Sequence, residues 1–394
     1  MIATLRLRKD IAAHVRRGHP WVYRDALEPP RQPLAPGALI AVEYKGERLS
    51  VGYVDPEGVI AVRRLGRGDD DPEVAWRARV DDALALRVRL AAWLDTDAVR
   101  LLHGENDGVP GLVIDRYADV AVVVLDGDGP AAFWRPRLDE VIAKIAATSG
   151  PLAHVWLRRV GGRRGKGGDA GEALRGGTPA EVTIREGQAR FPVDVVHGQK
   201  TGFFLDQRAN RRSIAARAGG RTVLNLFAYT GGFSVAAALG GATRVTTLDL
   251  AAPAIATARE AFRRSGIDDG AHELVAADAF KWLADARAAG RTWDVVVCDP
   301  PSFAPRESAR GAALGAYAEL NALAAAVVAP GGLLGTASCS SHVDADGFAN
   351  AVGEGVRRAG RRAHVVERAG ADRDHPVDPA FPEGRYLKWL LAAL

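Results

Sequence analysis

The 394-residue chain contains two cysteines, and both lie at the ends of apolar, strand-like runs. Cys339 lies in Thr336–Ser341, directly after the run Gly332–Gly335, and Cys298 immediately precedes Asp299 and two prolines. A thiol and a carboxylate at the same edge of a sheet can carry out covalent chemistry on an aromatic ring. We interpret Cys298 as a small buried hydrophobic residue and Cys339 as the candidate nucleophile, with burial at a strand end as the alternative for Cys339.

Carboxylates follow the other strand-like runs. Asp249, Asp278 and Asp299 each come close behind one run, and the loop Asn225–Phe233 after the first run contains adjacent glycines. In open parallel sheets ligands bind at the carboxyl ends of the strands, and Asp249 lies twenty residues after Tyr229, the spacing at which an acid contacts ribose hydroxyls. Together with Asp278 this pattern suits an adenosine. The alternative is that Asp249 and Asp278 only cap the helices that follow them.

From about residue 220 the sequence alternates between buried strands and helices. This alternation predicts an α/β fold with a mostly parallel sheet that is covered on both faces. The expected strands are 222–227, 245–248, 273–276, 295–298 and 333–337, and the expected helices are 232–239, 253–264, 279–288, 312–328 and 345–358.

The part of the chain before this sheet reads as two smaller domains. Residues 1–71 contain four β-rich runs punctuated by Gly and Pro, and residues 72–197 form an α+β domain that begins with a helix over 72–94. The sheet domain then occupies 198–394. Within the middle domain we expect two strands in 101–124, a helix over 134–147, a strand over 153–160, a flexible Gly- and Arg-rich loop at 161–179 and a hairpin over 181–193.

Composition restricts the class of protein. The chain has no run of about eighteen apolar residues and no basic-apolar leader, so we expect a cytoplasmic protein that does not cross a membrane. The net charge is +4, and the cations are 45 Arg against seven Lys. Arginine binds phosphate well, and residues 1–31 form a modestly basic segment, which suits nucleic acid. A genomic preference for Arg explains the overall bias equally well.

Six segments of the chain are similar to those of one family: His103–Tyr117, Gly198–Arg208, Phe227–Phe233, Cys298–Phe303, Ser338–Ser340 and Asp374–Val377. On these segments the chain resembles the bacterial 23S ribosomal RNA cytosine-5 methyltransferases, which join an N-terminal PUA domain, a middle domain and a class I methyltransferase domain. The resemblance covers nearly the whole chain. It implies large-subunit ribosomal RNA as the partner, S-adenosyl-L-methionine as the cofactor and no metal. It also favours a homodimer, although the sequence itself leaves the oligomeric state open.

The resemblance implies the site residues as well. The cofactor-binding residues would be Asn225, Phe227, Tyr229, Thr230, Gly231, Asp249, Asp278 and Asp299, with Gln207 and Arg208 near the methionine end. For Arg208 the alternative is a salt bridge that ties the hairpin at 181–193 to the sheet domain. The substrate contacts would come from Pro300, Phe303, Phe204 and Lys200, with core packing as the alternative for the aromatic side chains.

The implied chemistry starts from cytosine C5, which is a poor nucleophile. Attack of the Cys339 thiolate on C6 would activate C5 for methyl transfer, and Asp299 would stabilise the charge that develops on the ring. A base, which the sequence does not identify, would then remove the C5 proton before the thiol leaves. Many RNA cytosine-5 enzymes carry a second cysteine after the prolines that follow this aspartate. Here Ser302 and Phe303 follow instead, so product release would proceed without a second thiol.

Three other functions fit parts of the same pattern. An Asp-Pro-Pro segment followed by an aromatic residue can hold an exocyclic amine for direct methylation without a nucleophile. A non-catalytic RNA-binding assembly factor could retain the same fold. A nicotinamide oxidoreductase fits least well, because the loop Thr230–Ser234 lacks the third glycine of the dinucleotide-binding pattern.

Overall fold

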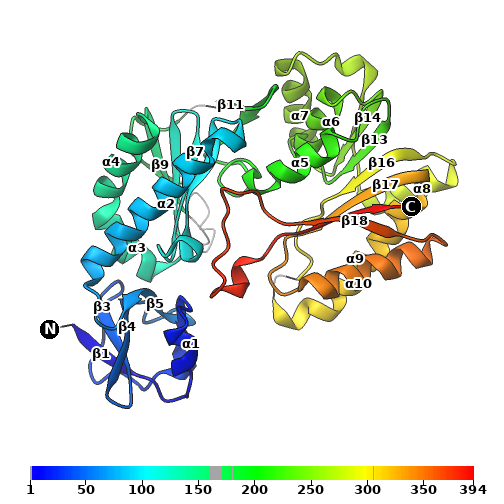
Figure 1. The fold of residues 1–394 in the computed structure, drawn as a ribbon. Coiled ribbons are helices and arrows are strands. Elements are labelled where there is room, and N and C mark those ends of the chain that lie inside the picture. Colours follow the sequence, from blue (N-terminus) through cyan, green and yellow to red (C-terminus); the bar gives the residue numbers. More distant parts are fainter. Residues whose placement is uncertain (1, 160–170, 180, 305) are drawn as a thin grey trace. The chain divides into compact units, whose positions relative to one another are not determined.

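The computed structural model describes residues 2–159, 171–179, 181–304 and 306–394. The chain forms two compact units and passes between them several times (Figure 1). None of the helices in the described ranges combines the length and the apolar character needed to span a membrane. The first unit comprises Met1–Val182, Val193–Phe203 and Arg373–Gly384, and the second comprises Thr183–Pro192, Phe204–Asp372 and Arg385–Leu394.

A five-stranded sheet forms the N-terminal part of the first unit, as its β-rich runs predict. Its elements are β1 (Ala3–Arg6), α1 (Ala12–Arg16), β2 (Trp21–Tyr23), η1 (Arg24–Ala26), β3 (Leu39–Tyr44), β4 (Glu47–Val54) and β5 (Ile60–Arg67). The strand order is β1-β3-β4-β5-β2, with β1 parallel to β3 and the other neighbours antiparallel. Val22, Val42 and Val62 are fully buried and belong to the hydrophobic core of this sheet.

The middle part of the first unit is a second five-stranded sheet with helices. Its elements are α2 (Pro72–Leu94), β6 (Ala98–His103), η2 (Gly104–Asp107), β7 (Leu112–Tyr117), β8 (Val120–Leu125), α3 (Asp128–Trp134), η3 (Arg135–Arg137), α4 (Leu138–Ser149), β9 (His154–Arg158) and β10 (Gly171–Arg175). The strand order is β10-β9-β8-β7-β6. Helix α2 begins where the sequence predicts, because the Asp71 carboxylate accepts hydrogen bonds from Glu73 N and Val74 N at 2.7 and 3.2 Å.

Three predictions for this middle part are wrong in detail. Residues 101–124 contain the end of β6, all of β7 and most of β8, which makes three strands and not two, because the two turns there separate three runs. The expected helix over 134–147 is divided, since α3 ends at Trp134 and Pro136 lies in the short η3 turn before α4. Residues 171–175 form β10, which pairs antiparallel with β9, where a loop was expected. The expected loop residues 161–170 lie outside the described residues.

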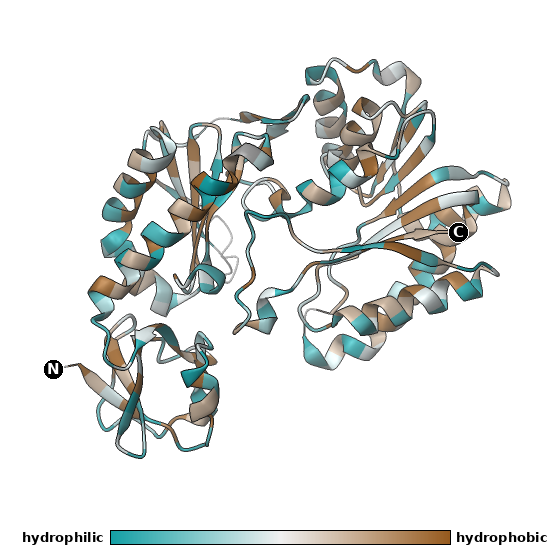
Figure 2. Cartoon of the chain, in the orientation of Figure 1, coloured by the Kyte–Doolittle hydropathy of each residue, from teal (hydrophilic) through white to brown (hydrophobic). Residues whose placement is uncertain are grey.

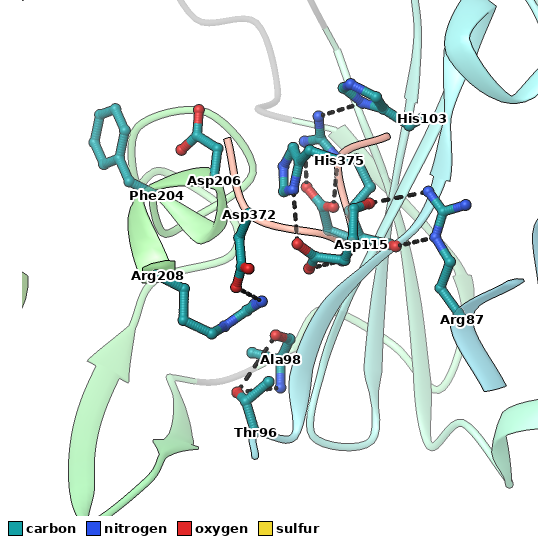
Figure 3. Close-up of polar contacts among 12 residues, drawn as sticks. Arg87, Thr96, Ala98, His103, Asp115, Phe204, Asp206, Arg208, Asp372 and His375 are labelled. Carbon is teal, nitrogen blue, oxygen red and sulfur yellow. Dashed lines mark hydrogen bonds and ion pairs between the residues drawn. The ribbon is translucent and has the colours of Figure 1, made fainter. Parts of the chain in front are cut away.

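The segment Arg373–Gly384 belongs to the first unit because it is anchored to the middle sheet. The Asp374 carboxylate accepts a hydrogen bond from Arg100 N at 3.0 Å, and Arg87 donates to the Asp374 carbonyl at 3.0 Å. His375 Nδ1 lies 2.9 Å from Asp374 Oδ1, and both side chains are buried (Figure 3). A segment distant in sequence therefore contributes to this core.

The second unit contains a hairpin and a larger sheet. Its elements are β11 (Val182–Glu186), β12 (Ala189–Val193), η4 (Leu205–Gln207), α5 (Arg208–Ala215), β13 (Thr222–Leu226), α6 (Gly232–Leu239), β14 (Arg244–Asp249), α7 (Ala252–Arg264), η5 (Asp269–Ala271), β15 (Glu273–Ala276), α8 (Ala279–Ala288), β16 (Trp293–Cys298), η6 (Glu307–Ala309), α9 (Arg310–Ala326), β17 (Val328–Ser338), α10 (Ala345–Arg358), β18 (His364–Ala369) and β19 (Lys388–Ala393). The sheet has seven strands in the order β15-β14-β13-β16-β17-β19-β18, and the predicted α/β alternation is confirmed.

The central strands are apolar throughout because helices cover both faces of the sheet. Val223 and Leu224 of β13 and Val295 and Val296 of β16 are fully buried. Figure 2 shows hydrophobic residues gathered along the strands and hydrophilic residues on the outer sides of the helices. This pattern distinguishes a buried parallel sheet from a sheet with one face in water.

Strands β18 and β19 were not predicted from the sequence. Strand β19 runs antiparallel to both β17 and β18 and lies between them, so it is an interior strand formed by the end of the chain. It pairs Lys388 with Ser338, the last residue of β17. The C-terminal segment thereby reaches the loop that carries Cys339.

Buried ion pairs join the hairpin to the start of α5. Arg211 donates to both carboxylate oxygens of Glu186, at 2.8 and 2.5 Å, and Arg208 Nε lies 3.7 Å from Glu186. Arg208 also donates to Asp372 at 2.9 Å (Figure 3). Burial opposes ionisation of Glu186, but Arg211 and Arg208 outweigh it, so the pKa of Glu186 is lower than usual. This network positions α5 and the residues just before it.

We predict that Glu186→Gln lowers the free energy of unfolding by about 3 kcal/mol at neutral pH, because it leaves buried guanidinium groups without their carboxylate. The lowered pKa also means that this stabilisation is present above pH 4.5, the ordinary value, and is lost as the pH falls below it. Urea unfolding of both proteins between pH 3 and pH 7 measures both effects.

A matched control is Glu260→Gln. Glu260 also pairs with two arginines, Arg263 and Arg264, but on the exposed side of α7. Exposed ion pairs contribute little, so this variant should unfold like the parent. Equal effects of the two substitutions would contradict the importance of burial.

Candidate active site

The strand order of the seven-stranded sheet reverses beside β13. The chain proceeds from β13 outward to β14 and β15 and then returns to the other side of β13 for β16 and β17. Leu226 is paired with Leu248 of β14 and with Cys298 of β16, so the residues that follow these strands come to the same edge. These residues are Phe227, Asp249 and Asp299. A reversal of this kind opens a crevice at the carboxyl ends of the strands, where ligands bind.

The loop after β13 has an unusual backbone. Phe227 and Tyr229 adopt positive φ angles of 55° and 48°, which non-glycine residues rarely do, and Gly231 has a φ of 80°. A Cβ on Gly231 would lie 2.9 Å from Ala258 Cβ, so only glycine fits against α7. The Asp249 carboxylate stabilises the loop by accepting a hydrogen bond from Tyr229 N at 2.8 Å. Strained backbone of this kind concentrates at binding sites.

Two predicted cofactor residues have buried polar side chains, Asn225 near the end of β13 and Thr230 within the loop. Asn225 is buried and donates to Ser234 Oγ at 2.9 Å, so its side chain organises the loop. Asn225 Oδ1 and Thr230 Oγ1 are buried without a hydrogen-bond partner in the described structure. Such atoms are rare in folded proteins and suit a polar ligand or water.

The other two predicted carboxylates differ in setting. Asp278 is exposed and caps α8 by accepting from Lys281 N at 3.0 Å, as the alternative interpretation anticipates. Asp249 is partly buried, and besides Tyr229 N it accepts from Ala251 N at 2.9 Å. Leu250, which the sequence analysis did not single out, is 73% exposed directly after Asp249. An exposed leucine beside a carboxylate offers an apolar surface for a nucleobase, and the carboxylate offers an acceptor for the hydroxyls of the attached ribose.

Gln207 contacts the predicted catalytic carboxylate. Its side-chain amide donates to Asp299 Oδ2 at 2.9 Å and accepts from Asn210, and Gln207 is 2% exposed. Arg208 does not accompany it. Arg208 is fully buried, and its contacts with Asp372 and Glu186 show the salt bridge that was the alternative to cofactor binding. Arg208 therefore holds α5 in place, while Gln207 orients Asp299.

The two cysteines have opposite environments. Cys298 is fully buried inside β16, as predicted, and burial raises the pKa of its thiol well above the usual value. Cys339 is partly exposed between two buried serines. Ser338 Oγ donates to Tyr317 Oη at 2.9 Å, and Ser340 Oγ donates to the Ala304 carbonyl at 3.1 Å. These bonds tie the cysteine loop to α9 and to the segment after Asp299, which leaves the thiol accessible between fixed neighbours.

The predicted substrate residues differ in their burial and in their contacts. Phe303 is partly buried and packs on Tyr317, with ring centroids 4.9 Å apart, and Phe204 packs edge-to-face on Tyr229 at 5.4 Å. Pro300 is buried directly after Asp299, and Lys200 is exposed in the first unit. The contacts of these two residues with a substrate stay predictions.

Lys388 and Tyr317 lie near Cys339 in the structure but were not predicted from the sequence. Lys388 is 7% exposed and pairs with Ser338, and Tyr317 is fully buried against the same serine. A single lysine within the apolar C-terminal run was the available signal for Lys388. Tyr317 lies inside an alanine-rich helix and gives no comparable signal.

Comparison with known proteins agrees with this geometry. A model of S-adenosylmethionine-dependent methyltransferases matches residues 135–390, and a model of PUA-like domains matches residues 5–67. The fold is thus a class I methyltransferase sheet with an N-terminal PUA-like domain. Among solved structures, a methyltransferase from Streptococcus mutans is 21% identical with a TM-score of 0.82, and a methyltransferase complexed with SAH is 22% identical with a TM-score of 0.82; each match covers 100% of both chains.

Two curated relatives match over almost their full length. A ribosomal RNA large subunit methyltransferase from Deinococcus radiodurans is 40% identical, over 98% of this chain and 95% of the relative. A ribosomal RNA large subunit methyltransferase I from Shewanella denitrificans is 37% identical, over 100% of this chain and 99% of the relative. The chain therefore belongs to the family of S-adenosylmethionine-dependent methyltransferases with a PUA-like N-terminal domain, which includes these two ribosomal RNA methyltransferases.

Proposed function

We propose that this protein methylates C5 of a cytosine in large-subunit ribosomal RNA through a covalent bond between Cys339 and C6 of the ring. The observation that carries the proposal is the accessible thiol of Cys339, anchored between buried serines at the sheet edge that also bears Asp299. The names of the two relatives support ribosomal RNA as the substrate. A methyltransferase that acts on an exocyclic amine would have no use for such a thiol.

The loop residues fit S-adenosylmethionine. The unpartnered oxygens of Asn225 and Thr230 can accept hydrogen bonds, the Asp249 carboxylate would accept from ribose hydroxyls, and the exposed Leu250 offers a surface for the adenine face. We expect Phe227 and Tyr229 to line the cofactor beside Asp249. When bound, the cofactor supplies a methyl group on a positively charged sulfur.

The residues of the chain would supply the rest of the chemistry. The Cys339 thiolate adds to C6, and the electron pair that moves onto the ring makes C5 nucleophilic. Asp299, held by Gln207, would stabilise the negative charge that develops on the ring, by donating a proton or hydrogen bond to N3 in its protonated form and by accepting from the exocyclic amine. After methyl transfer a base takes the C5 proton, the C6–S bond breaks, and the electron pair returns to sulfur. Phe303 and Phe204 can stack on an extruded base.

We predict that Cys339→Ala lowers turnover on ribosomal RNA by about a thousandfold or more, because no other group can form the bond to C6. The affinity for S-adenosylmethionine should stay within about threefold of the parent, since the thiol does not hold the cofactor. Methyl transfer from labelled cofactor, combined with mapping of 5-methylcytosine in the RNA, measures the first effect, and calorimetry measures the second.

The matched control is Cys298→Ala, which removes the other thiol from the strand interior and should retain turnover. RNA with 5-fluorocytosine provides a second readout, because C5 then carries fluorine in place of the hydrogen that a base must remove. The covalent adduct should therefore stay attached to the protein in a denaturing gel. Retained turnover in Cys339→Ala, with the methyl group found on an exocyclic amine, would refute the cytosine-5 mechanism.

A separate prediction concerns cofactor binding. Asp249→Asn should weaken S-adenosylmethionine binding about ten- to a hundredfold, because the amide is a poorer acceptor for ribose and no longer holds Tyr229 N as firmly. Asp268→Asn is the control, since Asp268 makes the same kind of turn bond, to Gly270 N at 3.0 Å, in an exposed loop. Equal affinities of the two variants in calorimetry would exclude Asp249 from the cofactor site.

A further inference from the structure

Lys388 occupies an unusual place for a lysine. It is the first residue of β19, is 7% exposed, and is paired across the ladder with Ser338, the residue before Cys339. Buried lysines are uncommon, because removing an ammonium group from water is costly unless other groups compensate. Such a position next to the candidate nucleophile calls for a chemical explanation.

The contacts of Lys388 hold its amine beside the cysteine loop. Nζ donates to the carbonyl of Ser340, the residue after Cys339, and to the carbonyl of Tyr386 at 2.8 Å. The amine is thus anchored to the residue on one side of Cys339, and its backbone is paired with the residue on the other side. An ammonium group has three donors, so one N–H remains after these two bonds.

The charges around this pair come from several elements. The negative charge of Asp344, just before α10, attracts the ammonium group of Lys388. The same carboxylate also accepts a hydrogen bond from Gly347 N and one from Arg310 at 2.6 Å. Tyr317 of α9 faces Cys339 and Asp299, and burial raises the pKa of this tyrosine, so it stays neutral. Burial lowers the pKa of Lys388 to about 8, although the negative charges of Cys339 and Asp344 oppose that change.

We propose that Lys388 activates Cys339, first as the base that takes its proton and then as the cation that holds the thiolate. In this step the S–H bond of Cys339 breaks and an N–H bond forms on neutral Lys388, which gives a thiolate and an ammonium ion without a change in oxidation state. An unperturbed thiol ionises near pH 8.5, so a nearby base and cation help the thiolate to form at neutral pH. The proposal rests on the proposed function, in which Cys339 is the nucleophile.

Alkylation of Cys339 tests this directly, without RNA or cofactor. The full-length protein is treated with iodoacetamide between pH 5.5 and pH 9.5, and mass spectrometry follows the two cysteine peptides separately. We expect Lys388→Met to slow alkylation of Cys339 about tenfold at pH 7 and to move the midpoint of its pH profile up by about one unit. Lys388→Arg, which keeps the charge, should restore the thiolate to within about threefold of the parent.

Two internal controls keep the test interpretable. Cys298 is fully buried, so its lack of alkylation shows that each variant is folded. Tyr317→Phe removes the hydrogen bond to Ser338 without changing a charge, and it should leave the midpoint unchanged. An unchanged midpoint in folded Lys388→Met would overturn the proposal, as would an equal shift in Tyr317→Phe, which would mean that loop anchoring alone sets the reactivity of the thiol.

The proposed function is tested separately from the role of Lys388. If Cys339→Ala retains methyl transfer, the cysteine is not the nucleophile, whatever its titration. If Cys339→Ala is inactive and Lys388→Met leaves both the alkylation profile and turnover unchanged, the covalent mechanism stands and the role of Lys388 is refuted.

Discussion

In-register hydrogen bonding among the parallel strands around β13 is the constraint on which the site depends. Because Leu226 is paired with both Leu248 and Cys298, the residues one step further along meet at a single edge. Those residues begin the strained loop at Phe227 and supply the carboxylates of Asp249 and Asp299. The strands that carry them are apolar and fully covered, so a shift in register would bury polar groups and expose core residues. The stability of the sheet and the geometry of the site therefore have the same origin.

The hairpin network extends this constraint to the region before the sheet. Glu186 and Asp372 hold Arg208 and Arg211 at the start of α5, and the residue before that helix, Gln207, bonds to Asp299. A buried charge that loses its partner is strongly destabilising, so this end of α5 has little freedom. The orientation of the Asp299 carboxylate thus depends on buried ion pairs as well as on its own contact with Gln207.

The cysteine loop is held by a different device. Ser338 and Ser340 bury their hydroxyl groups on either side of Cys339, and the antiparallel strand β19 closes the same region with Lys388. The hydrogen bonds of the two serines fix the loop on either side of the thiol, and the buried amine of Lys388 is anchored to the carbonyl of Ser340 in the same loop. Under the proposed mechanism, the position and the reactivity of the thiol would depend on separate residues.

Local patterns in the sequence determined most of the seven-stranded sheet and the family to which the protein belongs. Apolar runs separated by amphipathic helices specify covered parallel strands, so helices such as α6 and α10 were predicted at their observed bounds, and Asp249, Asp299 and Cys339 were found as strand-end residues. Tertiary structure alone decided the outcomes that depend on burial and long-range pairing. Arg208 became part of a buried ion pair, Pro300 became buried, and Lys388 was paired with Ser338, the residue before Cys339. No local pattern reports these outcomes, because each depends on a partner about fifty to more than 160 positions away, or on neighbours that only the packed sheet supplies.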